Sequence, residues 1–113
     1  MKKTALLLCG LLVMSTVAFA HPPSDIKIQF DPAAKVVIAT VEHRVSNPKT
    51  HYINKIDIGL NGKEVQTLTF TKQDANKEQT FAIPLPEAKK GDTLSVEGYC
   101  NLGGELEKEI KVA

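Results

Sequence analysis

The side chains that could bind a transition metal in this 113-residue chain are those of His21, His43, His51 and Cys100. Imidazole and thiolate suit zinc, copper or iron better than the hard cations magnesium and calcium. A short connection around Ser46–Pro48 separates His43 from His51, and Cys100 directly precedes another turn. These positions predict a metal site at one end of the fold. The alternative interpretation is two unrelated histidines and a small buried thiol.

Other kinds of chemistry find little support in the sequence. No serine stands with a histidine–carboxylate pair as an acyl-transfer triad requires. The glycines Gly59, Gly62 and Gly103–Gly104 fall at expected strand ends and turns, so they form no phosphate-binding loop. A net charge of +1 without a basic run excludes a nucleic-acid surface. A mean hydropathy of −0.11 excludes a polytopic membrane protein.

Residues 1–20 have the layout of a secretory signal peptide. Two lysines precede the apolar run Ala5–Val13, and the small residues of Ala18-Phe19-Ala20 follow. The run is shorter than the roughly 20 apolar residues of a transmembrane helix. We expect cleavage between Ala20 and His21, which leaves no membrane segment and sends residues 21–113 to the periplasm or out of the cell.

Cleavage changes the chemistry of the mature chain. Loss of Lys2 and Lys3 lowers the basic count from 14 to 12 against 13 acidic residues, which makes the net charge −1. Cys9 is removed too, so Cys100 remains as the one thiol, a liability in an oxidising compartment unless something holds it. His21 gains a free α-amine that could chelate a metal together with its imidazole. The alternative is that cleavage merely happens to expose a histidine.

Residues 21–113 are predicted to form one domain of short strands. Apolar and polar residues alternate through Asp25–Phe30 and Lys35–Val45, as in half-buried strands. Asn61-Gly62 is a strong hairpin signal. We expect the further strands His51–Leu60, Glu64–Phe70, Glu78–Ile83, Thr93–Cys100 and Glu105–Val112. The last could be helical by composition, but the turn before it favours a hairpin.

This pattern predicts an all-β fold, an immunoglobulin-like antiparallel β-sandwich of about seven strands. Along the second strand, one face carries Val37, Ala39, Val41, His43 and Val45. Along the third, Tyr52, Ile56, Ile58 and Leu60 share one parity. If the second, third and sixth strands are neighbours, as in many immunoglobulin-like sheets, His43, His51 and Cys100 converge.

The segments around these residues resemble the desulfoferrodoxin/superoxide reductase family. The resemblance rests on Glu42-His43, on His51-Tyr52-Ile53 and on the run Tyr99-Cys100-Asn101-Leu102-Gly103-Gly104. It implies an immunoglobulin-like β-sandwich with a mononuclear iron centre, held by four histidines and one axial cysteine. Members of this family reduce superoxide to peroxide with Fe(II).

The resemblance assigns roles to individual residues. His43 and His51 match two equatorial histidines, and Cys100 matches the axial, catalytic thiolate. His21 is the residue that could take the place of an upstream histidine. Gly103 stands where the family turn has its fourth histidine, the interval between His43 and His51 is longer than usual, and the family's Glu-Lys-His loop has no clear counterpart.

The resemblance also implies partners. These are superoxide or another small oxidant, and an electron donor that the sequence does not identify; a homodimer is left open. A copper or zinc site built from the same residues is an alternative. A second resemblance, through Asn61-Gly62-Lys63 and Lys89-Lys90-Gly91-Asp92, is to the Z subunit of the sulfur-oxidation carrier complex, a non-catalytic binding module with the same sandwich fold. The Tyr99-Cys100-Asn101 turn favours the iron family.

Overall fold

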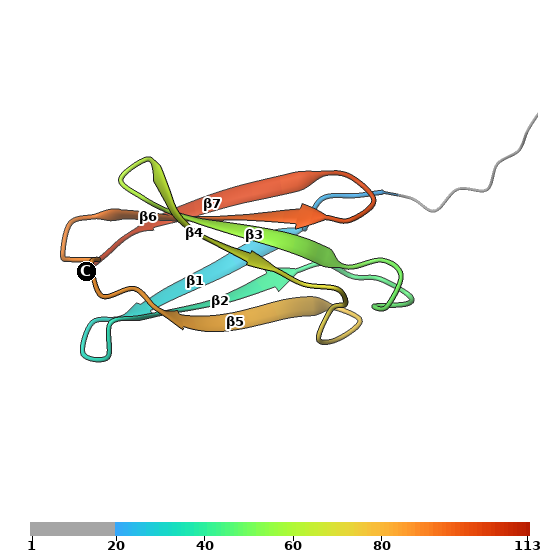
Figure 1. The fold of residues 1–113 in the computed structure, drawn as a ribbon, viewed down its shortest axis with the longest axis horizontal. Coiled ribbons are helices and arrows are strands. Elements are labelled where there is room, and N and C mark those ends of the chain that lie inside the picture. The colour runs from blue at the N-terminus through green and yellow to red at the C-terminus, as the bar shows by residue number, and fades with distance from the viewer. Residues whose placement is uncertain (1–19) are drawn as a thin grey trace, which may run out of the picture.

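The computed structural model describes residues 20–113, which form seven β-strands and, within this range, no helix (Figure 1). The predicted signal peptide lies almost entirely outside this range. The strands are β1 (Asp25–Asp31), β2 (Val36–Glu42), β3 (Ile53–Leu60), β4 (Lys63–Thr69), β5 (Glu78–Pro84), β6 (Thr93–Cys100) and β7 (Glu105–Lys111). Among the described residues, no helix exists that could cross a membrane.

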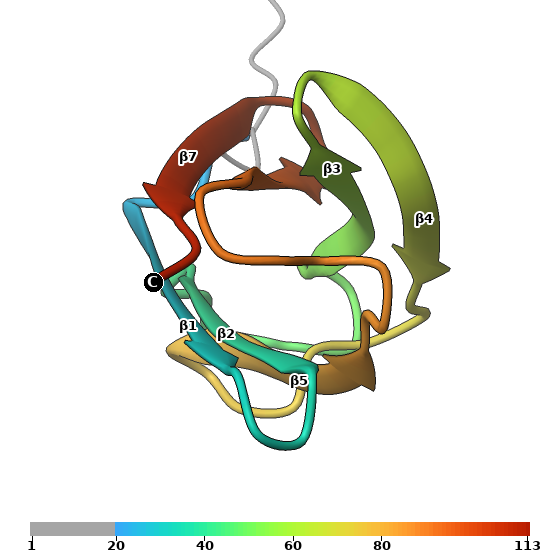
Figure 2. The same cartoon turned by 90° about the vertical axis from the view of Figure 1, so that its left-hand side faces the viewer.

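The strands form two sheets with the orders β1-β2-β5 and β4-β3-β6-β7, and all pairs are antiparallel. Figure 2 shows the two sheets facing each other, with the edge strands β1 and β7 close together on one side. The predicted all-β sandwich is therefore confirmed. The last segment is a strand paired with β6, as its hairpin turn indicated.

Alternation of apolar residues builds the core between the sheets. In β2, Val37, Ala39 and Val41 are buried, and the same register continues past the end of the strand to His43 and Val45. The β3–β4 turn has Asn61 at φ 54° and Gly62 at φ 83°, as the hairpin signal predicted. The largest buried cluster comprises Ile26, Val37, Val41, Ile53, Ile56, Ile58, Leu85, Ala88, Leu94, Val96 and Val112.

Two details differ from the expectation. The register of β3 against β6 shifts between Ile53 and Lys55, so Ile53 is fully buried although its parity differs from that of Ile56 and Ile58. Tyr52 is only half-buried. Furthermore, β3 and β6 are neighbours, but β2 lies in the opposite sheet. Convergence of the candidate ligands must therefore occur across one open end of the sandwich.

Candidate metal centre

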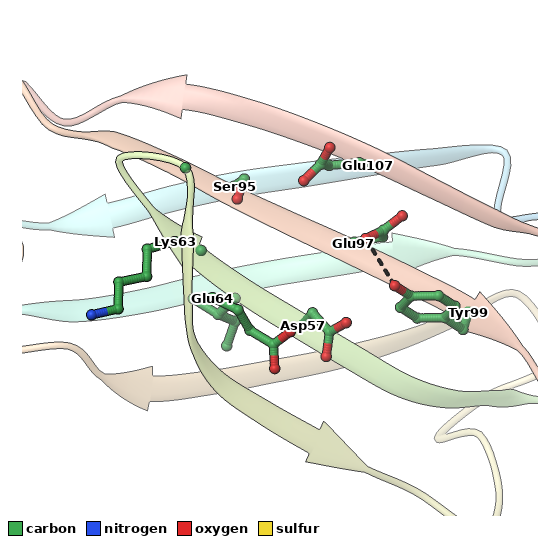
Figure 3. A pocket seen from close by; sticks show the side chains of 10 residues that line it. Asp57, Lys63, Glu64, Ser95, Glu97, Tyr99 and Glu107 are labelled. Atoms are coloured by element: carbon green, nitrogen blue, oxygen red, sulfur yellow. Dashed lines mark hydrogen bonds between the residues drawn. The ribbon is translucent and has the colours of Figure 1, made fainter.

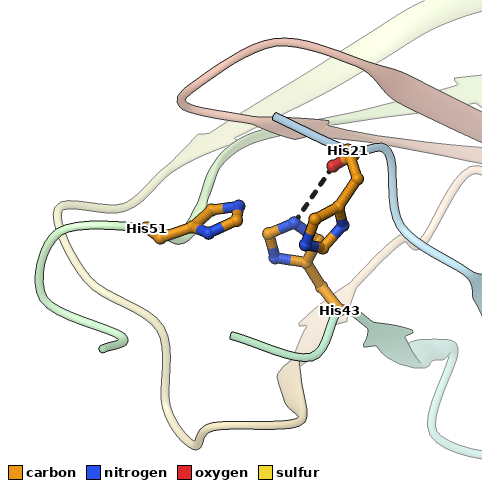
Figure 4. A group of neighbouring side chains, drawn as sticks. All are labelled: His21, His43 and His51. Carbon is orange, nitrogen blue, oxygen red and sulfur yellow. Dashed lines mark hydrogen bonds between the residues drawn. The ribbon is translucent and has the colours of Figure 1, made fainter. Parts of the chain in front are cut away.

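Three histidines from separate segments meet at one end of the sandwich (Figure 4). His21 precedes β1, His43 follows β2, and His51 precedes β3. The ring centroids are 4.6 Å apart for His21 and His43, 4.7 Å for His21 and His51, and 4.9 Å for His43 and His51. Each ring offers one nitrogen that lies within 4.8 Å of the others. The structure therefore brings together the three histidines that the sequence singled out.

The position of His43 follows from the register of β2. As the next inward-facing residue after Val41, it is 1% exposed. Its backbone N–H donates to the carbonyl of Lys77 at 2.9 Å, and Val45 N–H donates to Asn76 O at 2.7 Å. The segment after β2 is thus held against the β4–β5 loop, although β2 itself has ended.

A small turn and the side chain of Asn101 hold the backbone on both sides of His51. The N–H of His51 donates to Asn47 O at 3.0 Å, which closes the turn before β3. On the other side, Asn101 Oδ1 accepts the N–H of Tyr52 at 2.8 Å, and Asn101 Nδ2 donates to Thr50 O at 3.1 Å. The Asn101 side chain thereby ties the β6–β7 turn to the residues on both sides of His51.

His21 is carried by an extended approach to β1. Ser24 N–H donates to Glu42 O at 2.8 Å, which fixes the chain just before the strand. The backbone of Pro22 lies against Gly104, where a Cβ would be only 2.8 Å from Pro22 N. The carbonyl oxygen of His21 reaches to 3.2 Å from His43 Nε2. Both the main chain and the imidazole ring of His21 therefore lie at the three-histidine cluster.

Burial changes the protonation of two of the rings. It lowers the pKa of His43 below the ordinary value of 6.5. The hydrogen bonds to Gln73 and to the backbone of His21 oppose this shift in pKa, whereas the charge on the His21 ring adds to it. Burial also lowers the pKa of His51. The neighbouring rings of His43 and His21 lower this pKa further. Both rings therefore favour the neutral form, which is the form that binds metals.

One nitrogen atom gives a direct test of whether the cluster suits a metal ion. His51 Nε2 is buried and has no hydrogen-bond partner. Buried polar atoms without a partner are rare because each costs free energy. His43 Nε2 has only the carbonyl of His21 beside it. Nitrogen atoms of this kind, gathered within 4.8 Å, fit a transition-metal ion.

Cys100 is at the same end of the sandwich but is not a member of the three-histidine cluster. It ends β6, pairs with Ile53 in β3 and is 6% exposed. It is a free cysteine, and its Sγ accepts the N–H of Leu102 at 3.4 Å. Its place as a ligand stays a prediction.

The expected chelate of His21 also stays a prediction. A ring that shares a metal with its own α-amine must use Nδ1, the nitrogen nearer the backbone. Here Nδ1 lies 3.2 Å from Pro22 O. The chelate would therefore require the imidazole of His21 to turn.

One residue at the site was missed by the sequence analysis. Gln73 lies in the polar β4–β5 loop, is 3% exposed, and its Oε1 is 2.8 Å from His43 Nδ1. Nothing in the sequence distinguishes it from the polar residues around it, because its role depends on how the loop folds back. The one available signal is general: a ligating histidine needs a partner for its second nitrogen.

An antiparallel β-sandwich with three clustered imidazoles at one end defines a candidate metal-binding protein of the all-β class. The model of the desulfoferrodoxin family matches residues 20–109. The chain therefore belongs to the desulfoferrodoxin family.

One solved structure agrees with this assignment. A superoxide reductase (neelaredoxin) from Ignicoccus hospitalis is 27% identical with a TM-score of 0.51, over 80% of this chain and 82% of that chain. Two variants of that protein are 28% and 27% identical with TM-scores of 0.49, over 78% and 83% of this chain and 79% and 82% of theirs. No curated protein matches this chain significantly.

Proposed function

We propose that this protein is a mononuclear iron protein that reduces superoxide to hydrogen peroxide. The observation that carries the proposal is the cluster of His21, His43 and His51, with the unpartnered Nε2 of His51, in a fold of the desulfoferrodoxin family. The similarity to a superoxide reductase supports the choice of reaction.

His21, His43, His51 and Cys100 would hold the iron. When bound, Fe(II) supplies the one electron that, together with two protons, converts superoxide to hydrogen peroxide, and an external electron donor restores it from Fe(III). An imidazole that binds a metal adds no charge of its own, so histidine ligands leave the positive charge of the ion available to attract an anion. Copper or zinc would find the same donors acceptable.

Cys100 would supply a thiolate ligand to the iron. The N–H of Leu102 donates to its Sγ at 3.4 Å, which holds the side chain in place at the end of β6. A thiolate ligand donates electron density to the metal and so favours transfer of an electron to the oxidant. Because Gly103 supplies no side chain, the chain offers four candidate donors at this end of the fold.

We also propose that the protein is exported and cleaved after Ala20. An iron ligand role would protect the single remaining thiol in an oxidising compartment. Expression with the full sequence, followed by mass measurement of the exported protein, tests this. A product that starts at His21 supports export, and an uncleaved product retained in the cytoplasm contradicts it.

Rapid-mixing kinetics test the proposed reaction. The protein beginning at His21 is loaded anaerobically with Fe(II), and the decay of superoxide is followed with equimolar peroxide as the product. We expect rapid consumption by the wild type, a loss of at least tenfold in Cys100→Ser, and no loss in Lys63→Gln, which changes the distant β3–β4 turn. Superoxide decay at the spontaneous rate in the iron-loaded wild type would overturn the proposed reaction.

A further inference from the structure

Gln73 is a buried side chain in which every polar atom is used. Its Nε2 donates to His43 O at 2.7 Å and to Ala75 O at 2.9 Å. Its Oε1 lies 3.1 Å from the N–H of Ile53 and 2.8 Å from His43 Nδ1. Its backbone N–H donates to Pro48 O at 2.9 Å.

These contacts fix which way the Gln73 amide points. Both of its N–H groups face carbonyl oxygens, which can only accept. The reverse orientation would place the amide oxygen against those two carbonyls and the amide nitrogen against the N–H of Ile53. Only the observed orientation satisfies all four groups, so Gln73 Oε1 is the acceptor that faces His43.

The orientation of Gln73 determines the tautomer of His43. Since Gln73 Oε1 can only accept, His43 Nδ1 must carry a hydrogen to donate to it. In the neutral ring the lone pair is then on Nε2, which faces His21 O at 3.2 Å. Two acceptors in contact repel each other unless a cation lies between them. The lone pair on Nε2 is therefore available to a metal ion, on a nitrogen that belongs to the three-histidine cluster.

We propose that Gln73 is the positioning residue of the metal centre, which locks His43 in the Nδ1–H tautomer and presents Nε2 to the metal. Gln73 also connects the end of β2 with Ile53 at the start of β3, which lie in opposite sheets. The same side chain thus sets both the tautomer of one ligand and the distance between the two strand ends that carry His43 and His51. The consequence for metal binding rests on the proposed function, whereas the tautomer does not.

Long-range proton–nitrogen NMR of the metal-free wild type at pH 8 tests the tautomer directly. The expected result for His43 is a protonated Nδ1 and an unprotonated Nε2. A ring protonated mainly on Nε2 would overturn the proposal. This measurement needs no variant and no metal, so it decides the tautomer even if the cluster binds no ion.

A matched pair of variants separates positioning from support of the fold. Gln73→Glu and Gln73→Met both lose the amide donors to His43 O and Ala75 O, but Glu keeps an acceptor for His43 Nδ1. Titration with Co(II), followed by its visible absorption, should show about tenfold or more weaker binding in Gln73→Met. Gln73→Glu should stay within about threefold of the wild type.

Equal losses in the two variants would show a merely structural role and overturn the proposal. NMR of Gln73→Met adds a second readout. We expect the Nε2–H tautomer of His43 to appear in this variant, which a general loosening of the fold would not produce. If the wild type binds no Co(II), the proposed function fails. The tautomer of His43 is still decided by the NMR measurement on the metal-free protein.

Discussion

At the scale of single residues, the site contains one buried ring nitrogen that has no hydrogen-bond partner, Nε2 of His51. His51 Nε2 is buried and unpaired, and His43 Nε2 faces a carbonyl with which a neutral ring in the Nδ1–H form cannot bond. Buried polar atoms usually have partners, and leaving them unpaired reduces stability. An unpaired nitrogen beside two further imidazoles makes this cluster suitable for a metal ion.

Replacement of His51 by leucine should affect stability and metal binding in opposite directions. His51→Leu removes the unpartnered buried nitrogen, so the free energy of unfolding without metal should rise by about 1 kcal/mol. Affinity for Co(II) should fall by about tenfold or more. Denaturant unfolding and metal titration measure the two effects. The neighbouring variant Tyr52→Phe should leave metal affinity unchanged, and a metal-free His51→Leu less stable than the wild type would contradict this account.

Stability of the metal-free protein should depend on pH through His43 and His51. Their pKa values are lowered from 6.5, mainly by burial. Between 6.5 and the folded-state pKa values, the unfolded chain binds more protons, so the free energy of unfolding should fall as the pH falls through this range. Above pH 6.5 these two groups add no dependence. Unfolding curves from pH 8 to pH 5 check this, and His51→Leu should show a shallower decrease; rising stability below pH 6.5 would contradict it.

At the scale of elements, connections rather than strands place the candidate ligands. His21 depends on the β6–β7 turn, where Gly103 and Gly104 have φ values of 123° and 97°. At Gly104 a Cβ would lie 2.8 Å from Pro22 N. The second glycine therefore allows the segment that carries His21 to lie directly on the turn that follows Cys100.

Gly104→Ala should displace this segment. Gly62→Ala is the matched control, since Gly62 also has a positive φ of 83° but no atom within 4 Å of its added Cβ. Both variants should lose about 1 kcal/mol of stability through backbone strain. Gly104→Ala should lose about 1 kcal/mol more from crowding, and its metal affinity should also fall. Thermal unfolding and Co(II) titration compare the two, and equal effects on metal binding would exclude a role for the close approach of Pro22.

The sequence predicted the strands well and their connections less well. Alternation through β2 placed His43 on the buried face because period-2 patterning extends beyond the strand itself. It could not reveal the register shift at Ile53, which arises from pairing with β6. Gln73 was missed for a related reason: its partners His43 and Ile53 are 30 and 20 positions away.

At the scale of the whole molecule, the two sheets support a cluster that neither could build alone. His43 directly follows β2 of one sheet, and His51 shortly precedes β3 of the other. The sequence could predict the sandwich and, by resemblance, the family. It could not predict that β2 and β3 lie in different sheets, so that His43 and His51 meet across an open end of the sandwich (Figure 4). The outer face of the second sheet has a separate hollow of polar character, in which Tyr99 donates to Glu97 at 2.8 Å (Figure 3).

Exposed cations lie on the loops at the metal-binding end. Arg44 and Lys49 are in the β2–β3 loop and Lys72 is in the β4–β5 loop, which is joined to the first by the Gln73–Pro48 backbone hydrogen bond. Like-signed charges near a site raise the rate of association with an oppositely charged substrate.

Reversal of two of these charges should therefore slow the reaction with the superoxide anion. The double variant Lys49→Glu/Lys72→Glu should lower the second-order rate constant by about twofold or more at low salt, and the difference should shrink as ionic strength rises. Lys63→Glu, at the start of β4 and at the other end of the sandwich, should have a smaller effect. Rapid mixing over a range of salt concentrations measures this, and a salt-independent difference would argue against steering.

The central claim is that the histidine cluster and Cys100 together hold an iron ion. The most direct measurement is the visible absorption spectrum of the protein beginning at His21, loaded anaerobically with Fe(II) and then oxidised. We predict a thiolate-to-Fe(III) charge-transfer band that is present in the wild type and absent in Cys100→Ser. A wild type that retains no iron, or a band that persists unchanged in Cys100→Ser, would contradict the claim.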